Sequence, residues 1–178
     1  LTFFLIQEQP APNVAGPPEQ PAPALEVATV TPPAWPDLAI PKADYTQPGE
    51  QPELRGVEPA AFERAMVAYE QNNFATAAEQ LEVVTRLESD HAEAYFYRGV
   101  SLLLSGKSQD AIAPLKQAIQ LSAGPQHESS HYYLALAYLK TNQPREAVAE
   151  LDAVIKVRGR LRMEAVKLKR EVTAQIGR

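Results

Sequence analysis

Hydrophobic residues recur with helical spacing through residues 91–121, and a glycine divides this stretch into two halves. In the first half the large apolar residues cover two faces of a helix, and Gly99 leaves a gap where a neighbour can approach closely. Gly106 ends this helix, and Ser108 can cap a second one. The apolar positions are Tyr95, Phe96, Val100, Leu102, Leu103 and Leu104 in the first helix and Ala111, Ile112, Leu115, Ala118 and Ile119 in the second. The pattern predicts two helices joined by a tight turn.

The same layout occurs before and after this stretch, so the sequence predicts three copies of a helical hairpin. Small residues mark the register at spacings of 34 and 36 residues. They are Ala65, Gly99 and Ala135 in the first helices and Ala77, Ala111 and Ala147 in the second helices. Internal repetition at this period indicates a solenoid, in which each unit buries its apolar face against its neighbours.

The three units resemble tetratricopeptide repeats over roughly residues 58–157. That family places small residues where the paired helices touch, and the six residues named above match those positions. The resemblance extends to the turn residues Asn72, Gly106 and Asn142 and to the bulky Leu81, Leu115 and Leu151. The family's tryptophan position departs from the pattern and holds Ala61, Tyr95 and His131. The resemblance implies an all-α fold, a right-handed solenoid of helical hairpins.

A lone amphipathic helix is expected after the third repeat, at residues 161–176. A helix in this place covers the exposed end of a repeat stack. Its apolar stripe consists of Leu161, Ala165, Leu168, Val172 and Ile176. We therefore divide the chain into an amino-terminal arm, residues 1–57, and a solenoid with its capping helix, residues 58–178.

The arm contains twelve of the sixteen prolines, and this composition favours an extended course that cannot fold alone. Two apolar islands, residues 1–6 and 35–41, can anchor it on a protein surface. The anchor candidates are Phe3, Phe4, Leu5, Ile6, Trp35, Leu38 and Ile40. The first residue is leucine instead of methionine, which leads us to expect a removed signal or anchor segment and an extracellular or cell-envelope location. Any membrane contact would be made through that removed segment.

The net charge of −5 is unevenly distributed along the chain. Residues 1–57 carry −5, residues 58–155 carry −6, and residues 156–178 carry +6. Opposite charges at the two ends permit head-to-tail attraction between copies. A nucleic-acid partner is not expected, because the isoelectric point is near 5.3 and no aromatic residues interleave with the basic ones at the carboxy terminus.

The concave groove is the best candidate for a binding site, because the resemblance places the first helix of each repeat along it. The implied lining is apolar, and we expect it to bind an extended peptide with bulky apolar residues. The alternative is that some of these positions are ordinary core between helices. The lining consists of Phe62, Met66, Tyr69, Phe96, Val100, Leu103, Tyr132, Leu136 and Leu139.

One motif points to an enzyme. His127, Glu128 and His131 form HExxH, in which two histidines bind zinc and the glutamate activates water. We interpret the match as coincidence, because no third ligand stands out downstream and the motif directly follows a Gly-Pro turn. With no cysteine, no phosphate-binding glycine loop and no paired acid site in a cleft, we expect no catalysis, no cofactor and no metal.

The leading hypothesis is a non-catalytic interaction protein that assembles with copies of itself. The arm of one subunit would lie in the apolar groove of the next, and such a heterologous contact closes a ring or grows a filament. The alternative is an adaptor, exported or tethered at a bacterial envelope. In that case the arm is a spacer, and the groove binds an extended apolar segment of another protein.

Overall fold

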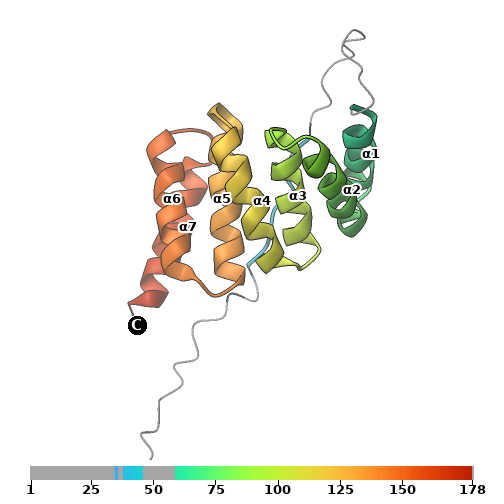
Figure 1. The fold of residues 1–178 in the computed structure, drawn as a ribbon. Helices are drawn as coiled ribbons and strands as arrows, with labels where there is room; N and C mark the ends of the chain where they lie inside the picture. Colours follow the sequence, from blue (N-terminus) through green and yellow to red (C-terminus); the bar gives the residue numbers. More distant parts are fainter. Residues whose placement is uncertain (1–34, 36–37, 46–58, 178) are drawn as a thin grey trace, which may run out of the picture. The chain divides into compact units, whose positions relative to one another are not determined.

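The computed structural model describes Trp35, residues 38–45 and residues 59–177. Within this part the chain forms helices and no strands, as the hydrophobic pattern predicts (Figure 1). The helices are α1 (Pro59–Glu70), α2 (Phe74–Leu87), α3 (Ala92–Leu104), α4 (Ser108–Leu121), α5 (Gly124–Lys140), α6 (Pro144–Val157) and α7 (Arg162–Ile176).

Each helix packs against the next one along the chain, and α3 also contacts α5. The pairs α1/α2, α3/α4 and α5/α6 are the three predicted hairpins, and α7 packs against α6 at the carboxy-terminal end (Figure 1). Ala165, Leu168 and Val172 form the buried stripe of α7, whereas Ile176 at its end is exposed. The predicted solenoid with a capping helix is confirmed. None of the described helices is both long and apolar enough to cross a membrane.

Each hairpin turns at a residue in the left-handed backbone conformation. The φ angles of Asn72, Gly106 and Asn142 are 61°, 82° and 61°. In the first turn the amide of Asn73 donates to the carbonyl oxygen of Ala68 at 2.9 Å, and the other two turns repeat this bond. Asparagine and glycine tolerate positive φ better than other residues, so these positions end the first helices. The predicted cap at Ser108 is wrong, since Ser108 is the first residue of α4 and Lys107 precedes it without a side-chain cap bond.

The small residues that mark the repeats lie where the helices approach most closely. All five alanines at these positions, Ala65, Ala77, Ala111, Ala135 and Ala147, are fully buried. A Cβ atom added to Gly99 would collide with the side chain of Leu115 on α4. Packing at this density explains why the register of small residues predicts the fold.

The contacts of the chain group Thr31–Arg178 into one compact unit. The described residues of the arm can therefore be placed relative to the helices. In Figure 1 this stretch passes along one side of α3 and α5. The domain boundary that we place at residue 57 stays a prediction.

Candidate peptide-binding groove

Residues 38–45, called the arm segment below, lie across the first helices of all three repeats. Three buried tyrosine hydroxyls donate hydrogen bonds to its backbone carbonyl oxygens. Tyr133 of α5 donates to Pro41 at 3.0 Å, Tyr69 of α1 to Ala43 at 2.9 Å, and Tyr97 of α3 to Asp44 at 2.8 Å. Donors from three helices thus bind three carbonyl oxygens within the four residues 41–44.

These hydroxyls are held in the protonated form that can donate. Burial raises the pKa of Tyr69, Tyr97 and Tyr133 well above the usual value near 10. Neighbouring groups raise these pKa values further, with Tyr133 acting on Tyr69 and Glu93 acting on Tyr97. A phenolate could not donate to a carbonyl oxygen, so the neutral form and the bound segment favour each other.

The arm segment also contributes side chains to the hydrophobic core. Ala43 is 8% exposed and belongs to the core cluster. Trp35, Leu38 and Ile40 are partly buried and pack against that cluster, and all three are anchor candidates from the sequence. The other four candidates, Phe3, Phe4, Leu5 and Ile6, lie outside the described residues.

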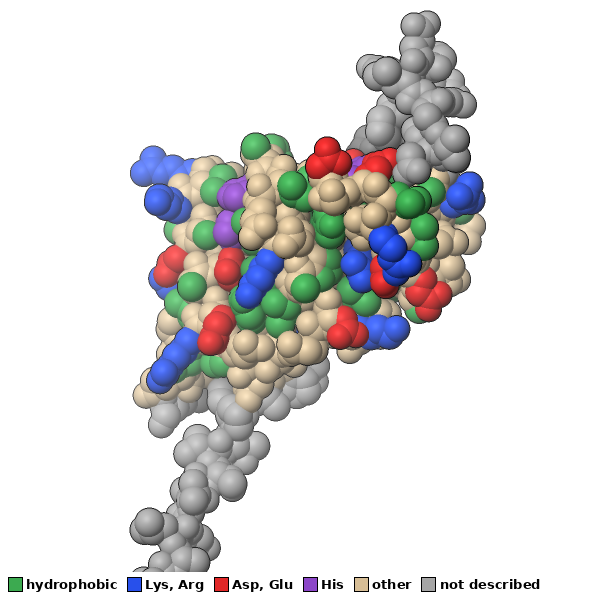
Figure 2. All heavy atoms as spheres, in the orientation of Figure 1, with side chains coloured by type: hydrophobic (Ala, Val, Ile, Leu, Met, Phe, Trp, Pro, Cys, Tyr) green, Lys and Arg blue, Asp and Glu red, His purple; other side chains and the backbone are tan. Residues whose placement is uncertain are grey.

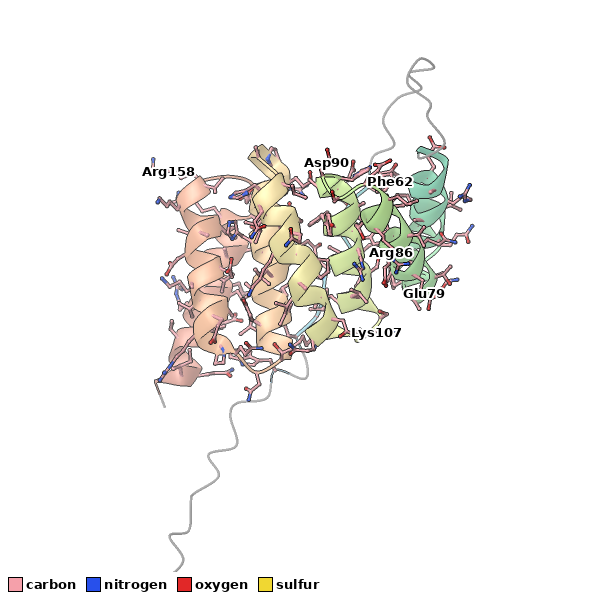
Figure 3. All side chains as sticks on the ribbon, viewed as in Figure 1. Phe62, Glu79, Arg86, Asp90, Lys107 and Arg158 are labelled. Carbon is pink, nitrogen blue, oxygen red and sulfur yellow. The ribbon has the colours of Figure 1, made fainter. Side chains whose placement is uncertain are left out.

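Tyr45 continues the contact toward the amino-terminal end of α1. Its ring packs edge-on against Phe62, which Figure 3 labels, and against Tyr97, at centroid distances of 6.2 Å and 5.5 Å. Burial, followed by the charges of Glu93 and Glu63, raises the pKa of Tyr45. The surroundings of Tyr45 are therefore aromatic and acidic.

The nine residues predicted to line the groove all lie in or against the core. Eight of them are buried, and Tyr132 is partly buried. Tyr69 bonds the arm segment and Phe62 contacts Tyr45. Phe96 packs edge-on against Tyr97 and so supports a residue that contacts the arm. That these nine line a binding surface for a partner stays a prediction.

Sequence reasoning missed Tyr97 and Tyr133. Both lie two residues before the small residue of their repeat, Gly99 and Ala135 respectively, and this recurrence is the signal that could have found them. The first repeat has Glu63 at that position, and Tyr69, further along α1, donates in its place.

Glu128 of the HExxH motif has a structural contact. The residue is 3% exposed, and its carboxylate accepts hydrogen bonds from the backbone amides of Arg160 and Leu161, at 3.1 Å and 2.9 Å. A Cβ atom on Gly159 would collide with this carboxylate. Glu128 therefore joins α5 to the turn before α7.

The two histidines of the motif form a hydrogen-bonded chain. His127 Nδ1 donates to the carbonyl oxygen of Ile119 at 3.1 Å, which leaves its Nε2 as an acceptor for His131 Nε2 at 3.2 Å. His131 Nδ1 lies 2.6 Å from Glu150 Oε2. Among the described residues no group of three His, Cys, Asp or Glu side chains is placed to hold a metal ion.

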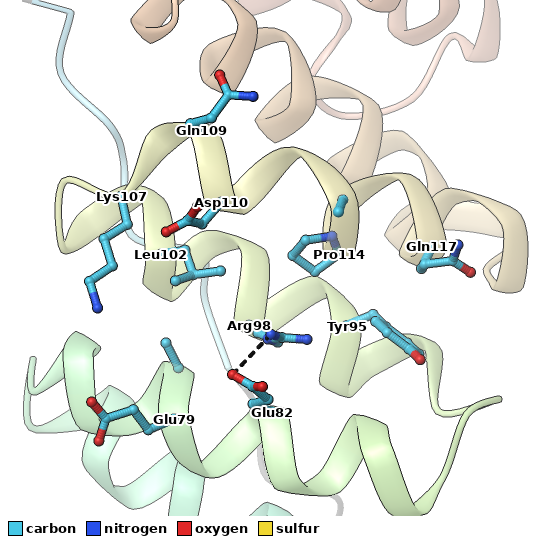
Figure 4. A pocket seen from close by; sticks show the side chains of 12 residues that line it. Glu79, Glu82, Tyr95, Arg98, Leu102, Lys107, Gln109, Asp110, Pro114 and Gln117 are labelled. Carbon is cyan, nitrogen blue, oxygen red and sulfur yellow. Dashed lines mark ion pairs between the residues drawn. The ribbon is translucent and has the colours of Figure 1, made fainter.

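A separate pocket lies between α2, α3 and α4 (Figure 4). In it Arg98 pairs with Glu82 at 3.1 Å and lies beside the hydroxyl of Thr85. The view in Figure 2 shows hydrophobic, acidic and basic side chains interspersed over the surface turned toward the reader.

The fold and the groove define a helical repeat protein with an extended segment across its first helices. Two tetratricopeptide repeat family models match the sequence, at residues 62–128 and 102–167, and together they cover more than half of the chain. The chain belongs to the tetratricopeptide repeat family.

Solved structures with the same fold include a chaperone of bacterial secretion. The Yersinia enterocolitica type III secretion translocator chaperone SycD is 11% identical, with a TM-score of 0.62 over 67% of this chain and 86% of that chain. SycD in complex with a peptide of the translocator YopD is 13% identical, with a TM-score of 0.55 over 70% of this chain and 94% of that chain. No curated protein matches the sequence.

The buried contact of Glu128 predicts a loss of stability in Glu128→Gln. The amide group replaces one acceptor oxygen with a donor, so a backbone amide loses its partner at a cost of about 1–3 kcal/mol. Urea unfolding followed by circular dichroism measures this loss. Glu171→Gln, an exposed change on α7, is the matched control and should stay within about 0.5 kcal/mol of wild type. Equal stability of the two variants would contradict the structural role.

The raised tyrosine pKa values predict a loss of stability at alkaline pH. The unfolded chain releases tyrosine protons near pH 10, whereas folded Tyr69, Tyr97 and Tyr133 retain theirs to higher pH. The contribution of these tyrosines to the unfolding free energy should therefore be constant below about pH 9 and fall as the pH rises above about 10. Urea unfolding at a series of pH values tests this. The fall should be shallower in Tyr97→Phe, and an identical slope in both proteins would rule out the assignment.

Proposed function

We propose that this chain is a non-catalytic protein-interaction module whose groove binds an extended peptide, with the arm segment as its built-in occupant. The observation that carries the proposal is the set of three tyrosine hydroxyls, one from each repeat, bound to the carbonyl oxygens of Pro41, Ala43 and Asp44. Backbone carbonyls are present in any extended peptide, so this mode of binding can accept a segment of another protein.

The helical surface under the arm segment supports the proposal. A helix uses its own backbone amides internally, so the first helices can hold an extended chain only through side-chain donors. Each such hydrogen bond contributes a net of about 0.5–1.5 kcal/mol, and the apolar contacts of Leu38, Ile40 and Ala43 add to it. SycD, which shares the fold, has been solved with a peptide of YopD, and peptide binding by a related fold agrees with this function.

Assembly between copies is the second candidate function. The contacts that hold the arm segment on its own repeats would be the same on the repeats of a neighbouring copy, connected through residues 46–58. Exchange of an identical element is a low-cost route to oligomers, and the effective concentration of the tethered segment decides between the two arrangements. Head-to-tail exchange would give the ring or filament expected from the sequence. The cell-envelope location and the adaptor role stay predictions.

Peptide binding is tested with the full chain carrying Ala43→Arg. Arginine does not fit the buried position of Ala43, so this variant should release its own arm segment and leave the groove open. A fluorescein-labelled peptide with the sequence of residues 35–45 should then bind, as measured by fluorescence anisotropy. It should bind wild type at least about tenfold more weakly, because the tethered segment competes.

Ala39→Arg is the matched control, because Ala39 is exposed in the same segment and tolerates the added charge. It should behave like wild type. Circular dichroism shows whether the Ala43→Arg chain is folded. A folded Ala43→Arg chain that binds no peptide would refute the proposed function.

Exchange between copies predicts that two defective variants complement each other. Ala43→Arg keeps its groove but lacks a segment that fits, and the triple change of Tyr69, Tyr97 and Tyr133 to Phe keeps the segment but weakens the groove. Each variant alone should be monomeric by light scattering, and an equimolar mixture should form a heterodimer. Wild type should gain mass with concentration. If wild type and the mixture both stay monomeric, the arm segment acts within one chain only.

A further inference from the structure

The side chain of Lys42 lies in a cradle at the carboxy-terminal end of α1. Its ammonium nitrogen donates to the carbonyl oxygen of Glu70 at 3.0 Å and to Oδ1 of Asn72 at 2.9 Å. It also lies over the rings of Tyr69 and Phe74, 5.2 Å and 5.9 Å from their centroids. Lys42 is an exposed residue, and two oxygen acceptors and two aromatic rings lie on the protein side of its ammonium group.

The chemistry of this cradle favours a positive charge. The last carbonyl groups of a helix carry the negative end of its dipole, and aromatic faces attract cations through their quadrupole. A carboxylate in the same place would find acceptors and ring faces on its protein side and no hydrogen-bond donor among these contacts. Lysine and arginine suit this position, whereas aspartate and glutamate are disfavoured.

The cradle is specific to the first repeat. The second repeat has Leu103, Gly106 and Ser108 at the positions of Tyr69, Asn72 and Phe74, and the third repeat has Leu139, Asn142 and Pro144. Neither repeat offers the two rings. A cation in the cradle therefore sets the register of a bound segment.

The positions after Lys42 impose two further conditions. Ala43 is buried, and its carbonyl oxygen is held by Tyr69, whose ring also faces Lys42. A larger side chain would push the backbone away from that hydroxyl. Asp44 forms an ion pair with Arg160 at 3.8 Å, but the two side chains are 87% and 76% exposed, so the pair adds little selection at this position. The ring of Tyr45, in contrast, packs against Phe62 and Tyr97.

We infer that the groove selects extended segments with a four-residue pattern: a lysine or arginine, a small residue, any residue, and an aromatic residue. A partner protein that displaces the arm segment would carry this pattern in an extended stretch. The inference rests on the proposed function and adds the chemistry of the ligand to it.

The test uses the full-length Ala43→Arg chain and labelled peptides with the sequence of residues 35–45. Replacing the peptide's lysine by methionine should weaken binding about fivefold, because the cation–π and hydrogen-bond contributions are lost. Arginine should retain binding, and glutamate should weaken it further than methionine. Leucine in place of the peptide alanine that corresponds to Ala43, or alanine in place of its tyrosine, should weaken binding about tenfold.

A variant of the cradle separates its role from general binding. Asn72→Gly removes the acceptor Oδ1 and preserves the left-handed backbone, since glycine already occupies the equivalent position, Gly106, at φ 82°. In the Ala43→Arg background, Asn72→Gly should weaken the binding of the lysine peptide about threefold and leave the binding of the methionine peptide unchanged. Asn142→Gly, the same change in the third repeat, is the matched control and should affect neither peptide.

The outcomes distinguish this inference from the proposed function. If all the peptides bind equally well, the groove binds peptides without the cradle's selectivity, and the inference is wrong while the proposed function stands. If no peptide binds the folded variant, both fail.

A second measurement does not need the released variant. Trp35 is the chain's single tryptophan, so its fluorescence reports the docking of the arm segment in the otherwise wild-type protein. Lys42→Met should lower the urea midpoint of the tryptophan signal, and Lys42→Arg should not. Equal midpoints for the two variants would also overturn the inference.

Discussion

The hydrogen bonds between three tyrosine hydroxyls and the backbone of the arm segment are the interaction on which the groove depends. An extended chain on a surface of helices finds no backbone partner, because the helices satisfy their own amides. Buried polar groups need partners, and here each side supplies what the other lacks: the carbonyl oxygens accept and the hydroxyls donate. Burial in turn raises the pKa of the tyrosines and keeps them protonated as donors. The donors, the occupant and the low polarity of the site therefore depend on one another.

This interaction also changes the mechanics of the repeat stack. In a solenoid each repeat contacts its neighbours, so stability is close to a sum of local terms. The arm segment departs from this rule, because Tyr69, Tyr97 and Tyr133 bind it from the first, second and third repeats. The arm segment thus connects the first repeat to the third. At the carboxy-terminal end of the stack, Glu128 also joins two elements. Its buried carboxylate connects α5 to the turn before α7. A motif that indicates zinc chemistry in isolation here holds the capping helix in place.

The sequence predicted the fold well because the fold is local and repeated. Steric requirements select the regularly spaced alanines and Gly99 where helices touch, and Asn72, Gly106 and Asn142 where the backbone is left-handed. These requirements recur in each repeat, so they can be recognised in one sequence. The groove was harder to predict. Hydrophobicity drew attention to Phe62 and Tyr69, but the donors Tyr97 and Tyr133 differ from core aromatics only by a hydroxyl whose partner lies many residues away. Lys42 and Ala43 gave no signal at all, because a lysine and an alanine in a proline-rich arm resemble solvated spacer until the register of the contact is known.

A groove that is occupied by its own chain imposes a condition on any partner. The tethered segment is present at a high effective concentration, so a ligand that makes only the backbone bonds to the tyrosines, which any extended peptide can make, gains nothing over the resident segment. A partner prevails only through additional contacts or a better fit at the side-chain positions. The cradle for Lys42 and the buried site of Ala43 are where such differences arise, because they respond to charge and size and not to the backbone. Under the proposed function, self-occupancy would convert a binding mode that accepts most peptides into one that discriminates between them.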